Sequence, residues 1–251
     1  MFKYLNHLVI SKFVMAITGL YLGVFITGHV IGNLQIFIGK DVFNSYAAFL
    51  QSLGELLWVE RIILILSLIF HIITSVYLKL YNNSVKPQKY AVTNYLKAKL
   101  NSRSMIWTGI MIGCFLIFHI LHFTTRDINP EFKGYEEQYS VAKVIPADLG
   151  FDIAYEQGID VKKVRHDAYK MVIDGFKDPI VSLFYIIAVI LLGVHVSHAM
   201  QSMFQTLGLN GPKFTPFIIK VSVIYGTFIA IAYLSIPLSV LLGFLGGAQW
   251  N

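Results

Sequence analysis

The stretch FVMAITGLYLGVFITGHVIGNLQIFI, residues 13–38, decides the fold class of this chain. It contains no Asp, Glu, Lys or Arg, and its histidine is His29. A helix of about 20 apolar residues crosses the hydrocarbon core of a bilayer, so the stretch predicts a transmembrane helix. Lys3 and Lys12 precede it, as in a signal peptide. The apolar run exceeds a signal peptide's core of about 15 residues and no small-residue cleavage site follows, so we expect a retained first helix.

Four more apolar stretches of similar length follow the first one. They cover roughly residues 59–80, 105–124, 179–206 and 217–244. Only 14% of the residues are charged, whereas a soluble domain carries about 25%. We therefore expect an all-α fold, an integral membrane bundle of five transmembrane helices that forms a single domain over residues 1–251.

The distribution of charge predicts the orientation of this bundle. The segments before the first span, between the second and third, and between the fourth and fifth contain no Asp or Glu. Their basic residues are Lys3, Lys12, Lys79, Lys86, Lys89, Lys97, Lys99, Arg103, Lys213 and Lys220. All fourteen acidic residues fall on the other side. The positive-inside rule places the N-terminus in the cytoplasm and the C-terminus outside. The net charge of +6 therefore indicates membrane topology, and no nucleic-acid partner is expected.

Two connections on the predicted outer side have some regularity. Residues 41–57 carry apolar side chains at helical spacing, which predicts a short amphipathic helix at the interface. Residues 126–178 form a long polar connection, and its last part, residues 161–176, is expected to form another short helix. The single cysteine, Cys114, lies in an apolar run and is read as a small buried hydrophobe.

Histidines inside the spans carry the functional signal. Six of the eight lie there: His29, His71, His119, His122, His195 and His198. An ionisable residue in a membrane is costly and points to function, although a histidine can also simply hydrogen-bond a neighbouring helix. His29, His71, His119 and His195 fall on four consecutive spans, which favours a shared site.

Depth divides these four histidines into two pairs. At 1.5 Å per residue, His29 and His119 lie about 24 Å and about 21 Å from the predicted cytoplasmic starts of their spans. His71 and His195 lie roughly 14–16 Å from the cytoplasmic ends of theirs. Imidazole is an axial ligand of haem iron. The spacing predicts two b-type haems within the first four helices, each held by two histidines, with no position left open for substrate.

Other residues near the four histidines admit two readings. His122 and His198 follow His119 and His195 by three residues and share a helix face with them. They are alternative ligands, or polar partners for haem propionates or quinone. Several glycines offer either room for a macrocycle or close helix packing: Gly19, Gly23, Gly28, Gly32 and Gly193.

Four phrases of sequence resemble a known family. They are TGLYLGVFITGHVIGN around His29, FNSYAAFLQSL followed by VERIILILSLIFH ending at His71, FHILHF around His119, and GVHVSHAMQSMFQTLGL around His195. In this order they resemble the di-haem cytochrome b subunit that anchors succinate:quinone oxidoreductases (succinate dehydrogenase or fumarate reductase) in bacterial cytoplasmic membranes. The resemblance implies that His29 and His119 hold the outer haem, and that His71 and His195 hold the inner one.

The same resemblance implies partners for the chain. Family members lie in membrane lipid beneath a flavoprotein and an iron–sulfur subunit, and the dicarboxylate reaction belongs to the partners. The basic segment from Lys79 to Arg103 would meet the iron–sulfur subunit, unless it only fixes topology and contacts anionic lipid. The anchor passes electrons to or from quinone, with menaquinone expected here.

Quinone in this family reacts near the outer haem, often beside an acidic residue at the outer edge of the second span. Glu60 matches that residue and would act as a proton relay, although an interfacial ion pair with Arg61 would also explain it. Two other functions remain open at this point. One is the cytochrome b anchor of another quinone-linked oxidoreductase, such as a hydrogenase or formate dehydrogenase. The other is a proton-coupled transporter with a histidine relay.

Overall fold

Five long helices dominate the computed structural model, which describes residues 2–85, 100–144, 155–209 and 211–246. They are α1 (Phe2–Leu34), α3 (Glu55–Ser84), α4 (Leu100–His119), α6 (Pro179–Thr206) and α7 (Phe214–Leu241). The short 3-10 turn η1 (Gln35–Phe37) extends α1, and the π-turn η2 (Ile120–Thr124) extends α4. All five are long and apolar enough to cross a membrane, so the predicted multi-pass bundle is confirmed in its helices. Helix α3 contains the predicted second span, residues 59–80, and it begins four residues before that span, at Glu55.

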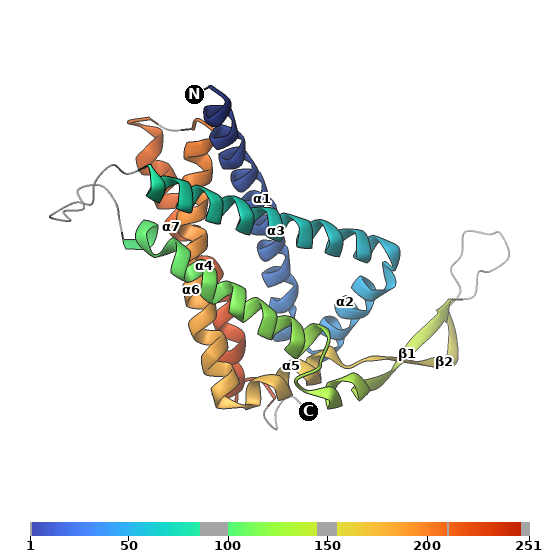
Figure 1. Cartoon of the computed structure of the whole chain (residues 1–251). Helices are drawn as coiled ribbons and strands as arrows, with labels where there is room; N and C mark the ends of the chain where they lie inside the picture. Colours follow the sequence, from blue (N-terminus) through green and yellow to red (C-terminus); the bar gives the residue numbers. More distant parts are fainter. Residues whose placement is uncertain (1, 86–99, 145–154, 210, 247–251) are drawn as a thin grey trace, which may run out of the picture.

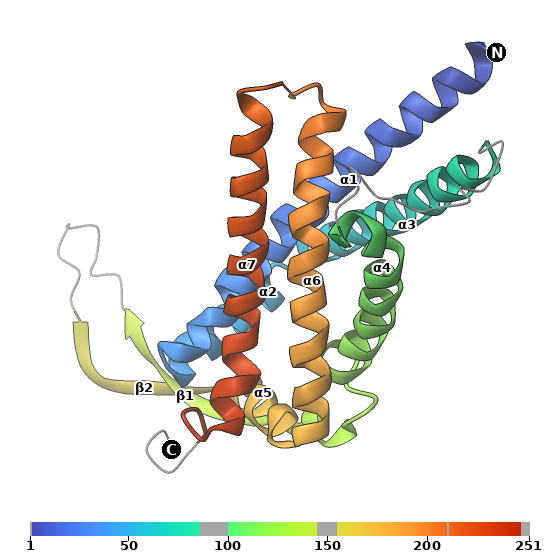
Figure 2. The ribbon, with the colours of Figure 1, turned by 90° about the vertical axis from the view of Figure 1, so that its left-hand side faces the viewer.

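The helices pack in the order α3, α1, α6, α4, with α7 against both α6 and α1. Figure 2 shows α6 and α7 side by side, and Figure 1 shows α3 crossing α1 at a steep angle. Among the described residues, neither α1 with α4 nor α3 with α6 is a pair that packs extensively. Those two pairs of helices carry the candidate histidine pairs.

Two glycines explain the close approach of α6 and α7. A Cβ atom at Gly193 would lie 2.6 Å from the carbonyl oxygen of Gly226, and a Cβ at Gly226 would collide with the carbonyl oxygen of Gly193. Without side chains, the two backbones can touch, as small residues allow in membrane helices. The structure therefore assigns Gly193 to helix packing, which was one of its two readings.

A cap covers one end of the bundle, opposite the N-terminal end of α1 (Figure 1). It consists of α2 (Lys40–Ser52), the 3-10 turn η3 (Pro130–Gly134), strands β1 (Glu136–Val144) and β2 (Tyr155–His166), and α5 (Ala168–Lys177). The two strands form one antiparallel hairpin. The predicted amphipathic helix is confirmed as α2, and it stops near Gly54, whose φ of 51° lies in the left-handed region that favours glycine.

The hairpin corrects the all-α prediction. Residues 161–166, which we expected to begin a helix, continue strand β2 and pair with β1. The helix begins only at Ala168, because the Asp167 side chain caps it by accepting the N–H of Lys170. The helix was predicted from the spacing of apolar residues within 161–176 alone. Pairing of residues 161–166 with β1 depends on a distant segment, which that spacing does not contain.

Asn44 of α2 ties the parts of the cap together. It is 0% exposed, and its Nδ2 donates to Glu137 Oε1 at 2.7 Å and to Asp167 Oδ1 at 3.0 Å. Its Oδ1 accepts the N–H of Tyr169 at 2.7 Å. Asn44 thereby joins α2, β1 and α5.

Ion pairs surround this amide. Lys40 Nζ lies 3.0 Å from Glu137 and 2.8 Å from Asp167, and Arg165 pairs with Glu137 and Asp41. Burial raises the pKa of Asp167, but hydrogen bonds from Lys40, the Lys170 N–H and Asn44 outweigh it and hold that pKa below its ordinary value. Asp167 therefore stays ionised at neutral pH.

Asn44→Ala is expected to loosen the cap without unfolding the bundle. The change leaves buried groups on Glu137, Asp167 and Tyr169 without their partner, a loss of about 1–3 kcal/mol. Hydrogen exchange should accelerate at the amides of β1, β2 and α5. Ser52→Ala, which removes an exposed hydroxyl from the same helix, is the control and should change nothing. Unchanged exchange in Asn44→Ala would show that the network does not hold the cap.

Candidate functional site

His29 of α1 and His119 of α4 face each other. Their ring centres are 5.9 Å apart and the ring planes are nearly perpendicular, at 85°. Two imidazoles on opposite sides of one metal ion place their ring centres about 6 Å apart, since a metal–nitrogen bond is about 2 Å long and each ring centre lies about 1 Å beyond the nitrogen. The observed separation therefore fits a pair of axial ligands.

His71 of α3 and His195 of α6 are the second candidate pair, and each has a hydroxyl partner from another helix. Thr18 Oγ1 lies 3.3 Å from His71 Nδ1, and Thr108 Oγ1 lies 3.0 Å from His195 Nδ1. A partner on Nδ1 orients the ring, as is usual for histidines that bind metals.

His119 is held in the same manner. The hydroxyl of Tyr185 on α6 lies 3.3 Å from His119 Nδ1 and 3.1 Å from the Nδ1 of His122. Three of the four candidate ligands thus have a hydroxyl partner on Nδ1 that comes from a different helix. Sequence reasoning had identified the histidines but none of these hydroxyls.

The two pairs lie at two levels of the bundle. On α1, Thr18 contacts the second pair and His29 belongs to the first, eleven residues further on. On α4, Thr108 and His119 are separated by the same eleven residues. Eleven residues are three helical turns, about 16 Å, so each threonine lies on the same helix face as the histidine that follows. The His29–His119 pair lies on the side of the cap.

A repeat in the sequence would have revealed the two threonines. TGLYLGVFITGH at residues 18–29 and TGIMIGCFLIFH at residues 108–119 share the pattern T-G-x-x-x-G-x-F-x-x-x-H. The phenylalanines have the same role in both copies. Phe25 stacks on His29 with ring centres 5.5 Å apart, and Phe115 lies 5.8 Å from His119. Helices α1 and α4 therefore carry the same three side chains at the same spacing: a threonine near the second histidine pair, and a phenylalanine and a histidine at the first pair.

The glycines near the pairs differ in their surroundings. A Cβ atom at Gly28, which is exposed beside His29, would meet nothing within 4 Å. Gly19 instead lies against the His71 ring, where a Cβ would be 3.2 Å from Cε1, and Gly32 lies against Tyr46. No group of three or more His, Cys, Asp or Glu side chains suited to a bare metal ion occurs in the described parts of the chain. Haem iron needs only two axial ligands from the protein, so pairs of histidines suffice.

His122 has surroundings different from those of His119. It is 1% exposed, whereas His119 is half-buried. Its ring packs on Phe123 at 4.0 Å and lies 5.8 Å from Phe132 of the cap. His122 therefore fills an aromatic cluster, and the role of polar partner suits it better than that of ligand. His198 is half-buried one turn beyond His195, and their charges interact.

Glu60 contacts α1 rather than Arg61. Its carboxylate accepts a hydrogen bond of 2.7 Å from the Tyr21 hydroxyl, while the Arg61 guanidinium lies 4.9 Å above the Trp58 ring. Tyr21 is three residues from Thr18 and eight from His29, so Glu60 is not level with His29 as expected. The reason is the earlier start of α3 and its oblique path across α1 (Figure 1).

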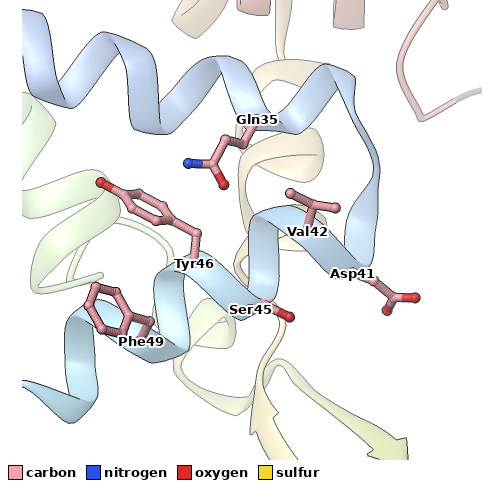
Figure 3. Close-up of a pocket in the computed structure, with 6 residues that line it drawn as sticks. All are labelled: Gln35, Asp41, Val42, Ser45, Tyr46 and Phe49. Atoms are coloured by element: carbon pink, nitrogen blue, oxygen red, sulfur yellow. The ribbon is translucent and has the colours of Figure 1, made fainter.

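A shallow hollow of about 490 Å³ lies between the end of α1 and α2. Its lining residues are Gln35, Asp41, Val42, Ser45, Tyr46 and Phe49. Figure 3 shows Gln35 and Tyr46 projecting into the space between the two helices. Tyr46 packs over Gly32, which lies three residues beyond His29 on α1.

Comparisons with known proteins do not identify the chain: no family model, curated protein or solved structure matches it. A functional proposal therefore depends on the residues and geometry of the chain itself. The basic segment from Lys79 to Arg103, predicted to meet a partner, lies for the most part outside the described residues.

Proposed function

We propose that this chain carries electrons across a membrane through two b-type haems, as the anchor subunit of a succinate:quinone oxidoreductase. The observation that carries the proposal is the facing pair His29 and His119, with ring centres 5.9 Å apart. A second histidine pair three turns away supports two haems rather than one. When bound, such haems supply one-electron transfer.

Each protein residue has a defined part in this function. His29 and His119 would hold the haem nearer the cap, and His71 and His195 the other one. Tyr185, Thr18 and Thr108 would orient three of these rings through Nδ1. Because two histidines would hold each haem, no position would remain for a substrate, and the site would serve electron transfer.

The proposal extends to the partners and the membrane. The cap lies outside a bacterial cytoplasmic membrane, and the N-terminal end of α1 faces the cytoplasm. An iron–sulfur subunit and a flavoprotein dock on the cytoplasmic side over the basic segment from Lys79 to Arg103. Dicarboxylate chemistry takes place on those partners, and this chain exchanges electrons with quinone, which we propose to be menaquinone.

Quinone is proposed to react on the cap side. The hollow beside Tyr46 supports this because it lies on the cap side, where Tyr46 packs over Gly32, and combines an apolar lining with polar groups. Glu60 is proposed to relay protons, although its contact with Tyr21 places it nearer the middle of α1. A carboxylate with a hydroxyl partner can accept and release the protons that accompany quinone chemistry.

The visible absorption spectrum of the purified protein tests the proposed function. Two b-type haems should give sharp bands on reduction with dithionite, at a ratio of two haems per chain. Absence of haem bands in protein purified from cells able to make haem would refute the proposal and would favour a transporter with a histidine relay. Haem bands without electron exchange with quinol would instead favour an anchor with a different electron acceptor.

Glu60→Gln should slow electron transfer to quinone while leaving both haem spectra intact. Loss of an acid–base group typically costs about 100-fold or more in the step that it serves. Tyr21→Phe is the matched control, since it removes the hydrogen bond to the carboxylate and retains the acid. Stopped-flow reduction of the haems by a menaquinol analogue measures the rate. An unchanged rate in Glu60→Gln would exclude Glu60 from the proton pathway.

A further inference from the structure

The hydroxyl of Tyr185 on α6 lies between two histidines. It is 3.3 Å from Nδ1 of His119 and 3.1 Å from Nδ1 of His122. Tyr185 is 4% exposed, and the rings of Phe176 and Phe115 stand nearly perpendicular to its own, with centres 4.9 Å and 5.0 Å away. Among the described residues, this hydroxyl has no hydrogen-bond partner other than the two histidines.

Other hydroxyl groups in the bundle have a backbone acceptor. The Tyr233 hydroxyl donates to the carbonyl oxygen of Ile26 at 2.8 Å. Thr108 Oγ1 lies 3.1 Å from the carbonyl oxygen of Met105 and 3.0 Å from His195 Nδ1. A hydroxyl has a single hydrogen. Thr108 therefore makes both contacts at once only if it donates to the carbonyl and accepts from His195, which places the hydrogen of that imidazole on Nδ1.

The single hydrogen of the Tyr185 hydroxyl restricts both of its histidine partners. A neutral imidazole carries its hydrogen on one ring nitrogen and accepts at the other. The hydroxyl cannot donate to two Nδ1 atoms at once. If both imidazoles donated to it instead, its own hydrogen would be buried without an acceptor, which is costly. One of the two histidines therefore accepts from Tyr185 at Nδ1, and the other donates to it.

The proposed ligation of haem gives this chain of hydrogen bonds a direction. Because Nδ1 of His119 contacts Tyr185, Nε2 is the nitrogen available for iron. A neutral imidazole that binds a metal through Nε2 carries its hydrogen on Nδ1. His119 then donates to Tyr185, and Tyr185 donates to His122.

His122 is well held for the part of final acceptor. It is 1% exposed, and Phe123 packs on its ring with centres 4.0 Å apart. On the other helix, α5, a Cβ atom at Gly175 would lie only 3.2 Å from His122 Cε1, so the cap also touches the ring. His122 belongs to the π-turn η2, and such turns are rare and frequent at functional sites. Close packing on both sides keeps Nδ1 directed at Tyr185.

We propose that His122 is a positioning residue for His119. It accepts the hydrogen of Tyr185, which keeps the hydrogen of His119 on Nδ1 and leaves Nε2 for haem iron. The inference rests on the proposed function. A hydrogen bond donated from Nδ1 makes an imidazole a more basic ligand. A chain of hydrogen bonds strengthens each of its members, so His122 favours the more positive, oxidised iron without touching it.

Redox titration of the purified two-haem protein in detergent tests the chain, with the cap-side haem identified as the one lost in His119→Ala. Tyr185→Phe should raise the reduced-to-oxidised ratio of that haem about tenfold at a fixed potential, which is about 59 mV for one electron. His122→Phe should retain both haems and raise the ratio about threefold, because it shortens the chain without breaking it. The other haem should keep its potential in both variants.

Two further variants separate the hydrogen bond from packing. His122→Asn retains an oxygen that can accept from Tyr185, so its potential should stay close to that of the wild type. Phe132→Leu is the control, because it alters a ring 5.8 Å from that of His122 and leaves the chain intact. It should not change the potential.

The double variant of Tyr185→Phe and His122→Phe shows whether His122 acts through the tyrosine. Its potential should equal that of Tyr185→Phe alone. A His122→Phe shift of the same size with and without Tyr185 would overturn the inference, and so would no shift at all. If Tyr185→Phe lost its haem, an equal shift in His122→Asn and His122→Phe would overturn it. Each of these results leaves the proposed function intact, whereas absence of haem from the wild type would refute that function and this inference with it.

Discussion

His119→Ala is expected to remove one of the two proposed haems, whereas His122→Ala should leave both in place. The two histidines are three residues apart on one helix, so they offer a close comparison. His119 is half-buried and faces His29 across 5.9 Å. His122 is almost fully buried among aromatic rings, and its Nδ1 is 3.1 Å from the Tyr185 hydroxyl.

The reason for the difference is coordination. A haem held by His29 and His119 would lose one of its two protein ligands in His119→Ala, and alanine offers no replacement. The haem-to-protein ratio should fall from two to one in His29→Ala and His119→Ala, with loss of the same spectral component. His71→Ala and His195→Ala should remove the other component.

Two outcomes would contradict the proposed pairing of His29 with His119. If His29→Ala and His119→Ala removed different haems, the facing pair would not share one iron. If His122→Ala removed a haem and His119→Ala did not, the ligand on α4 would lie one turn nearer the cap. Pyridine haemochrome assays combined with protein quantification measure the ratio in each variant.

Gly226→Leu is expected to prevent α7 from packing on α6. The Cβ of any larger residue at Gly226 would collide with backbone atoms of Gly193 and would lie 2.6 Å from the Cβ of Ser197. Backbone cannot move aside as a flexible side chain can, so the cost should be about 3 kcal/mol or more. We expect little monodisperse protein after detergent extraction and an earlier loss of haem absorbance on heating.

Val194→Leu is the control for this variant. It enlarges a neighbour of Gly193 that is 38% exposed and directed away from the contact, so stability should not change. A Gly226→Leu protein as stable as wild type would mean that α6 and α7 are not in backbone contact. The amount of monodisperse protein is a readout that does not depend on the haem proposal.

The five long helices could be predicted from the sequence because the composition and length of each apolar run are enough to indicate a membrane span. Lipid surrounds most of each helix, so nearly every side chain in a run must be apolar, and length alone then indicates a span. Residues 13–38 show this, since all of the predicted span except Ile38 lies within α1 and η1. The pairing of histidines by depth also follows from helix geometry, in which each residue adds a fixed rise. The facing of His29 and His119 agrees with it.

The cap could not be predicted in the same manner. Strand β2 pairs with residues eleven to thirty positions earlier in the chain, from Val144 with Tyr155 to Glu136 with His166. The helical spacing of apolar residues after residue 161 suggested a helix instead. Glu60 was expected at the edge of a span, but α3 begins at Glu55 and crosses α1 obliquely, which brings Glu60 to Tyr21. Crossing angles depend on how side chains of two helices interlock, and one helix alone does not contain that information.

By itself, the sequence determined that this is a multi-pass helical chain with histidines at two depths, because hydrophobicity and helical rise are local properties. The repeated pattern T-G-x-x-x-G-x-F-x-x-x-H was also present in it, at residues 18–29 and 108–119. Only the tertiary structure decided which groups meet. Thr18 with His71, Thr108 with His195 and Tyr185 with His119 each join two different helices. Such contacts are set by the packing of the whole bundle, which places residues far apart in the chain within hydrogen-bonding distance.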